Sequence, residues 1–225
     1  MTGAAAPMAA PMTRRAALLV LTMAALTPRI VSTAFAQSPA ARTESRTADA
    51  TAPVARLNEA LLDLMRRGGR EPKRARMNGF LPVLEELFDL ETALRIAAAP
   101  YFDGAGEAER RQALDAFARR SAAQYVDRFD SYSGQTLAIE GERPGPRGMT
   151  LVDTSLVRPG KAPVRLTYVL REEGGRWRIL DVLAKGTVSQ LAAQRSEFQT
   201  ALRKGGLAEL TRDLNSNADR LLGGA

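Results

Sequence analysis

The segment VRLTYVLREEGGRWRILDVLA, residues 164–184, decides the fold class, because two largely apolar runs meet at a pair of glycines. Three apolar side chains occupy alternate positions of the first run: Leu166, Tyr168 and Leu170. Because side chains two residues apart share one face of a strand, residues 164–172 and 176–184 predict an antiparallel hairpin with one dry and one wetter face. Trp177 and Ile179 fall on the dry face of the second strand.

Two more strands are predicted before this hairpin, at residues 136–142 and 149–157, with proline- and glycine-rich turns after each. Apolar residues at spacings of three and four predict six helices on either side of the strands. These helices span residues 53–67, 80–90, 90–99, 107–132, 187–204 and 207–222. Helices, then antiparallel strands, then helices predict an α+β domain. We expect a four-stranded antiparallel sheet, with the helices before and after it covering one face.

Three local features of the helical part carry specific expectations. The basic stretch RRGGREPKRAR, residues 66–76, predicts a solvated loop after the first helix. Asp89 is the predicted N-cap of the third helix. The long helix over residues 107–132 carries a mostly apolar stripe, which we interpret as core. Its members are Leu114, Phe117, Ser121, Tyr125, Phe129 and Tyr132.

The N-terminal residues predict an export signal followed by a single folded domain. Paired arginines precede a short apolar run, and a small-residue cleavage site ends at Ala36. We therefore expect a cleavable signal over residues 1–36, a flexible leader over 37–52 and one domain over 53–222, located in the periplasm. The arginines fit a twin-arginine signal only loosely, and an uncleaved membrane anchor is the alternative.

Composition excludes several classes of function. The 225 residues contain no cysteine and no histidine, which removes disulfides, thiolate and imidazole metal ligands, and the usual catalytic base. Loss of residues 1–36 removes three arginines and no acid, and lowers the net charge from +7 to +4. This modest and diffuse charge does not indicate nucleic-acid binding. We expect no cofactor, no metal site, no catalytic residue and no nucleic-acid partner, hence a protein that is not an enzyme.

Asp181 and Lys185 are the charged residues of most interest, because both lie near the end of the last strand. Alternation from Ile179 places Asp181 on the same face as Trp177. A carboxylate there needs partners: it acts as a general base, or it accepts backbone N–H groups or an arginine and fixes neighbouring helices. We favour the structural role, because no histidine or second carboxylate stands at a supporting spacing. Lys185 is either a surface lysine or a cation at a pocket rim.

Several segments together resemble the MlaC family, also called toluene-tolerance auxiliary proteins. They are YSGQT at 132–136, the segment from Val157 to Phe198, LRKGGLAELTRDL at 202–214 and FDLETALRIA at 88–97. Two positions depart from the family pattern: Ala99-Pro100 stands where Leu-Gly is usual, and Lys185 replaces an acid. The change at Lys185 leaves head-group preference open, including the hopanoid cargo associated with the HpnM subgroup.

The resemblance implies an NTF2-like fold and a periplasmic phospholipid shuttle. Its partners would be an outer-membrane lipoprotein–porin complex and an inner-membrane ABC transporter bearing an MCE-domain protein. Acyl chains would occupy an apolar pocket between sheet and helices, with Lys185 at its rim. The candidate lining residues are Phe80, Leu84, Phe88, Leu137, Ile139, Leu166, Tyr168, Leu170, Trp177, Ile179, Val188 and Leu191.

Three alternatives stay open from the sequence. The cargo is a hopanoid or another polycyclic lipid rather than a phospholipid. The protein is an isomerase or hydratase on the same scaffold, with Asp181 as base and Tyr168 as acid. Or it is an adaptor with a closed core that binds only transport subunits. Apolar residues that line a cavity and those that pack a core have the same sequence pattern, so the pattern does not choose among these.

Overall fold

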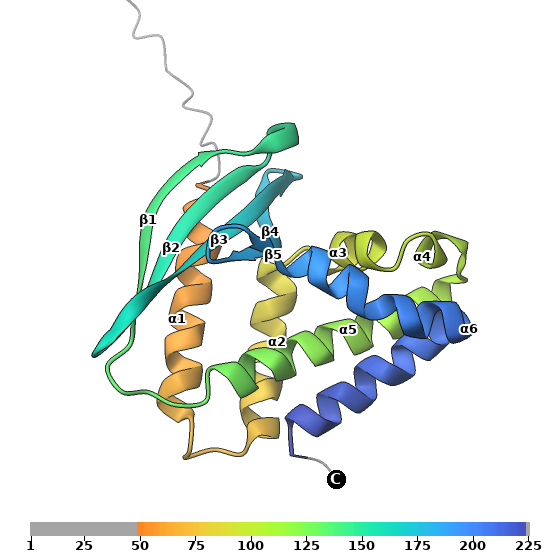
Figure 1. Cartoon of the computed structure of the whole chain (residues 1–225), viewed down its shortest axis with the longest axis horizontal. Coiled ribbons are helices and arrows are strands. Elements are labelled where there is room, and N and C mark those ends of the chain that lie inside the picture. The colour runs from red at the N-terminus through yellow and green to blue at the C-terminus, as the bar shows by residue number, and fades with distance from the viewer. Residues whose placement is uncertain (1–48, 224–225) are drawn as a thin grey trace, which may run out of the picture. The chain divides into compact units, whose positions relative to one another are not determined.

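The structure is a computed structural model, and it describes residues 49–223. The predicted signal over residues 1–36 and the leader up to residue 48 lie outside the described residues. The helices are α1 (Thr51–Arg67), α2 (Lys73–Leu87), α3 (Leu90–Ala97), α4 (Tyr101–Gly104), α5 (Glu107–Arg128) and α6 (Gln190–Leu221) (Figure 1). The strands are β1 (Thr136–Pro144), β2 (Thr150–Arg158), β3 (Lys161–Glu173), β4 (Arg176–Ala184) and β5 (Val188–Ser189).

The strands form one antiparallel sheet in chain order, and α3, α5 and α6 lie on one side of it (Figure 1). The α+β class and the antiparallel sheet are confirmed, and four of the five strands are the predicted ones. The fifth strand, β5, is two residues long and pairs with the end of β4, Leu183 opposite Ser189. So short a strand has no alternation of its own, which is why the sequence pattern did not reveal it.

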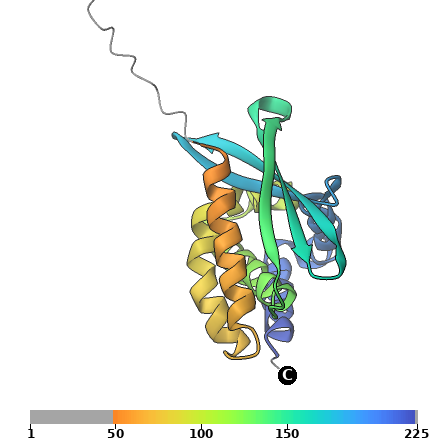
Figure 2. The same cartoon turned by 90° about the vertical axis from the view of Figure 1, so that its left-hand side faces the viewer.

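Helix α1 packs beside α2, and its inward stripe explains the pairing (Figure 2). Val54, Leu57, Leu61 and Leu64 recur at helical spacing and are fully buried, as the periodicity predicted. An ion pair between Arg56 and Glu86 links the outer faces of the two helices.

The basic stretch after α1 is not a loop throughout, which corrects the prediction from charge. Helix α2 begins at Lys73, seven residues before the predicted start at residue 80. Pro72 precedes it, and Arg76 is buried with its Nη1 donating to the Leu64 carbonyl at 3.5 Å. The prediction was wrong here because the arginine contributes its aliphatic stem to the core, which a count of charges does not reveal.

Helix α6 turns back on itself at Gly205 and Gly206, where two helices were predicted to meet (Figure 1). Gly206 has φ 63° and ψ −152°, a backbone conformation essentially restricted to glycine. Helix α5 packs against α6 through Arg120, whose Nη2 donates to both carboxylate oxygens of Glu197 at 2.7 Å. The reversal keeps both halves of α6 beside α5 and leaves the first half to close one end of the sheet.

Candidate functional site

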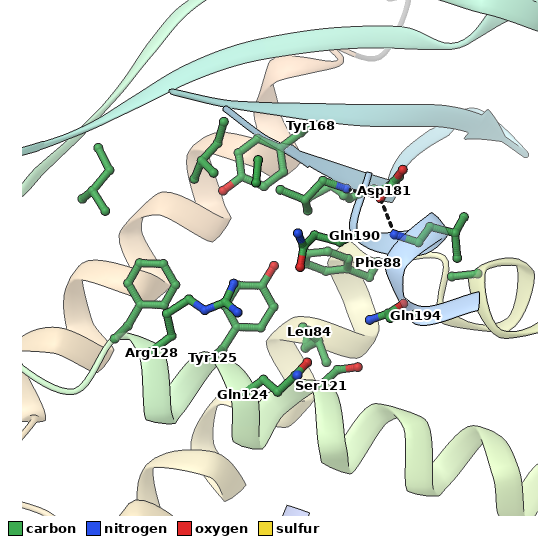
Figure 3. Close-up of a pocket in the computed structure, with 18 of the residues that line it drawn as sticks. Leu84, Phe88, Ser121, Gln124, Tyr125, Arg128, Tyr168, Asp181, Gln190 and Gln194 are labelled. Atoms are coloured by element: carbon green, nitrogen blue, oxygen red, sulfur yellow. Dashed lines mark hydrogen bonds between the residues drawn. The ribbon is translucent and has the colours of Figure 1, made fainter. Parts of the chain in front are cut away.

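A cavity of 440 Å³ lies between the sheet and the helices. This volume falls within the range of about 300–1,000 Å³ that is typical of small-molecule sites. Leu84 and Phe88 come from the end of α2, Leu166 and Tyr168 from β3, and Leu191 from α6 (Figure 3). The walls are therefore mainly apolar and come from segments far apart in the chain.

Six of the twelve predicted lining residues line this cavity: Leu84, Phe88, Leu166, Tyr168, Ile179 and Leu191. The other six do not: Phe80, Leu137, Ile139, Leu170, Trp177 and Val188. Phe80 and Leu170 are 2% and 0% exposed and belong to the closed core. Val188 is 53% exposed, and Trp177 lines a separate hollow that Arg56 and Glu86 also line. The alternation of side chains identified the correct face of the sheet, but not the part of that face that borders the cavity.

Leu137 and Ile139 lie on the sheet face that alternation predicted, but outside the cavity. Both lie on β1, where Leu137 pairs with Leu156 and Ile139 with Thr154. Leu156 lines the cavity, so Leu137 shares its sheet face but lies one strand farther out. The strand order, rather than the alternation, decides which of them reaches the cavity.

Helix α5 provides lining residues that the sequence analysis assigned to core. Phe117, Ser121, Tyr125 and Phe129 of the predicted stripe line the cavity, together with Gln124. A stripe that includes a serine beside aromatic residues is less apolar than a closed core requires. That mixed character was the available signal.

Tyr125 is held by three aromatic rings at the helical side of the cavity. Its ring centroid lies 5.4 Å from Phe80, 6.0 Å from Phe88 and 6.0 Å from Phe129. Burial raises the pKa of Tyr125, and nearby Arg128 lowers it by a smaller amount. Burial likewise raises the pKa of Tyr168, and Tyr125 adds to that rise. Both phenols are therefore neutral hydrogen-bonding groups near neutral pH.

Asp181 does not share a face with Trp177, which corrects the expectation from alternation. Ile179 pairs with Leu170, but Asp181 pairs with Val169, so a β-bulge at Leu180 inserts one residue between them. Past the bulge the alternation is reversed, and Val182 rather than Asp181 pairs with Tyr168.

The carboxylate of Asp181 instead holds the start of α6. Its Oδ2 accepts from the Ser189 hydroxyl at 2.5 Å. Its Oδ1 accepts from the N–H groups of Val182 at 2.7 Å and Leu191 at 2.9 Å, and Figure 3 shows where Asp181 lies at the cavity. Ser189 in turn caps the helix by accepting from Ala192 N at 2.9 Å. These contacts favour the structural role over an acid–base pair with Tyr168.

A second acid of the cavity wall, Asp89, is also engaged. It caps α3 as predicted, because its Oδ1 accepts from Thr92 N at 3.2 Å. Its Oδ2 accepts from Arg171 at 2.5 Å, and the Asp89 N–H donates to the Ile179 carbonyl at 2.8 Å. Arg178 adds bonds to the carbonyls of Glu85 and Phe88. The sheet is thus fastened to the junction between α2 and α3.

Lys185 lies in the exposed turn after β4 and does not line the cavity, although Ala184 does. Its φ of 55° is unusual for a residue other than glycine, and Gly186 follows with φ 75°. The Lys185 N–H donates to the Arg165 carbonyl at 2.9 Å. Lys185 therefore occupies a tight turn between β4 and β5, next to the lining residue Ala184, and its role at a pocket rim stays a prediction.

Comparison with known proteins gives a family and a solved structure. The family model described as MlaC protein matches residues 55–216. A phospholipid-binding protein from Ralstonia solanacearum, solved in complex with a phospholipid, is 18% identical. That match has a TM-score of 0.64 and covers 77% of this chain and 99% of the other. No curated protein matches the chain.

None of the helices within residues 49–223 is both long and apolar enough to cross a membrane. Within the same range, no three His, Cys, Asp or Glu side chains are grouped so that they could hold a metal ion.

Proposed function

Because the chain belongs to the MlaC protein family, we propose that it carries a phospholipid through the periplasm. The acyl chains of this lipid would lie between the sheet and α5. The observation that carries the proposal is the cavity of 440 Å³ with apolar walls. Each buried methylene contributes about 0.8 kcal/mol, so about ten of them contribute about 8 kcal/mol without any hydrogen bond. The phospholipid in the Ralstonia solanacearum protein supports the same cargo class.

The proposed carrier exchanges its lipid with membrane complexes at both ends of its path. We take these to be an outer-membrane lipoprotein–porin complex and an inner-membrane ABC transporter with an MCE-domain protein. Transfer requires no chemistry in the carrier, because a lipid moves whenever the receiving site binds it more tightly. The engaged state of Asp181 agrees with such a role, since neither of its oxygens is free to act as a base.

Lipid extraction tests the proposal directly. The full chain is exported in a Gram-negative host, purified without denaturant or detergent, and extracted with organic solvent for lipid mass spectrometry. We expect about one phospholipid per protein. Protein that carries no lipid and takes up none from vesicles would refute the carrier function, and a stoichiometric polycyclic lipid would change the cargo.

A pair of variants ties the bound lipid to this cavity. Ala184 lines the cavity, whereas Ala192 is exposed on α6 and does not. Ala184→Trp should fill part of the cavity and lower the bound lipid several-fold, while Ala192→Trp leaves it unchanged. Thermal unfolding of both delipidated variants checks that each has folded. Equal lipid content in the two variants would place the lipid elsewhere.

A further inference from the structure

The charged residues of the cavity wall differ in whether they have hydrogen-bond or ion-pair partners within the protein. Four charged side chains line the cavity: Asp89, Asp181, Arg128 and Arg158. Both acids accept hydrogen bonds from the protein, as described above. Among residues 49–223, neither arginine side chain forms an ion pair or a hydrogen bond, and the Nε of Arg158 is buried without a partner. The wall therefore presents two guanidinium groups that have no protein partner among the described residues.

The two arginines reach the cavity wall from different elements. Arg128 ends α5 and lies beside Tyr125, close enough to influence the pKa of that phenol (Figure 3). Arg158 ends β2, and its neighbours on the wall are the apolar side chains Leu156 and Val164. The hydroxyl of Tyr168 belongs to a residue that is 1% exposed, and no hydrogen bond to it occurs within the described residues. The Nε of Arg158 is a buried polar atom without a partner, and such an atom calls for a ligand.

We propose that Arg128 and Arg158 form an anion subsite that binds the phosphodiester of the lipid cargo, while the Tyr168 hydroxyl bonds to an ester oxygen. This inference rests on the proposed function, since it presumes a lipid in the cavity. A guanidinium matches phosphate oxygens with paired N–H donors, and such charge-assisted bonds are short and strong. The subsite selects lipids with an anionic phosphodiester over uncharged lipids, including polycyclic hydrocarbons without a phosphate.

The test compares two lipids that differ only in the phosphoglycerol head group, which contains the phosphodiester. Delipidated full chain is offered vesicles containing either phosphatidylglycerol or a diacylglycerol with identical acyl chains, and bound lipid is quantified by mass spectrometry. We expect wild-type protein to take up at least tenfold more phosphatidylglycerol. Glycerol phosphate and inorganic phosphate, offered at the same concentration, should displace less than a tenth of it, because they lack acyl chains.

Variants assign the preference to the arginines. Arg128→Gln and Arg158→Gln should each weaken phosphatidylglycerol binding about tenfold, and the double variant should take up both lipids equally. Arg203→Gln is the matched control, because Arg203 is exposed on α6 and does not line the cavity. It should behave as wild type.

The possible results separate this subsite from the carrier function. Equal uptake of the two lipids by wild-type protein overturns the subsite and leaves the carrier function standing. Uptake of neither lipid overturns both. Displacement of phosphatidylglycerol by inorganic phosphate alone shows a free-phosphate site and refutes the lipid assignment. The wild-type comparison needs no variant, so a variant that fails to fold does not prevent the decision.

Discussion

At the scale of single residues, the cavity separates side chains that serve the fold from those that remain available to a ligand. Asp181 and Asp89 hold helix starts, and their oxygens are engaged within the protein. Tyr168 is as buried as any core residue, yet its hydroxyl has no hydrogen-bond partner within residues 49–223. The first group should affect stability when changed, and the second should affect binding.

Tyr168→Phe should therefore separate stability from binding. The hydroxyl of this cavity-lining residue forms no hydrogen bond within residues 49–223, so its removal should leave the stability of the delipidated variant within about 1 kcal/mol of wild type. Its phospholipid should dissociate several-fold faster, because the bond to the ester oxygen is lost. Urea unfolding and lipid release to vesicles measure the two effects. Tyr132→Phe, at a ring 43% exposed outside the cavity, should change neither.

Asp181→Ala should destabilise the fold by about 1–3 kcal/mol, because it leaves the N–H groups of Val182 and Leu191 and the Ser189 hydroxyl without their acceptor. Urea unfolding of the delipidated protein measures the loss. Asp213→Ala, at an exposed position of α6, should stay within about 0.5 kcal/mol of wild type. A stable Asp181→Ala protein would contradict the role in holding α6.

At the scale of elements, glycine has opposite effects on the stability of two helices. Gly206 has φ 63° and allows α6 to reverse, whereas Gly79 lies inside α2 with only Arg67 side-chain nitrogens at 3.6–3.8 Å from an added Cβ. Helix interiors favour alanine over glycine by about 1 kcal/mol. Backbone conformation, rather than residue type, thus decides the effect of the same substitution.

Gly206→Ala should lower the free energy of unfolding by about 1–3 kcal/mol, since alanine is strained in that conformation. Gly79→Ala should raise it by up to about 1 kcal/mol. Chemical denaturation of both variants provides the comparison. Two changes of the same sign would show that α6 does not reverse as described.

Sequence periodicity predicted most elements but not how far the helices stand from the sheet. The four longer strands, the Asp89 cap and the break at Gly205 follow from local pattern, and all are present. Six of the twelve predicted residues do line the cavity, because alternation reveals the face of a strand. Phe80 and Phe88 illustrate the rest: both are apolar residues of one segment, yet only Phe88 reaches the open volume. That difference depends on where α5 lies, which is a long-range packing outcome.

At the scale of the whole molecule, two buried phenols couple stability to alkaline pH. Burial raises the pKa of Tyr125 and Tyr168 above their usual value of about 10. The folded state then favours the neutral phenols, so their contribution is complete below pH of about 10 and is lost as the pH rises further. The fold should therefore weaken at alkaline pH as these groups ionise in the unfolded chain.

The measurement is urea unfolding of delipidated protein from pH of about 8 to about 11. The free energy of unfolding should fall above pH of about 10, and the double variant Tyr125→Phe, Tyr168→Phe should show a shallower fall. Tyrosinate absorbance recorded during the titration reports when the phenols ionise. An equal slope in wild type and variant would mean that the two phenols titrate alike in both states.

The bulge at Leu180 divides β4 into two segments whose side chains alternate between the sheet faces in opposite order. Up to Ile179 the strand presents one set of alternate residues to the cavity, and from Asp181 onward it presents the other set. If Leu180 paired with Val169 instead of bulging, the segment 181–184 would shift by one residue and exchange its faces. Asp181 would then lie opposite Tyr168, and Val182 would lie on the other face of the sheet. The bulge therefore keeps an apolar side chain, rather than an acid, opposite the phenol of Tyr168.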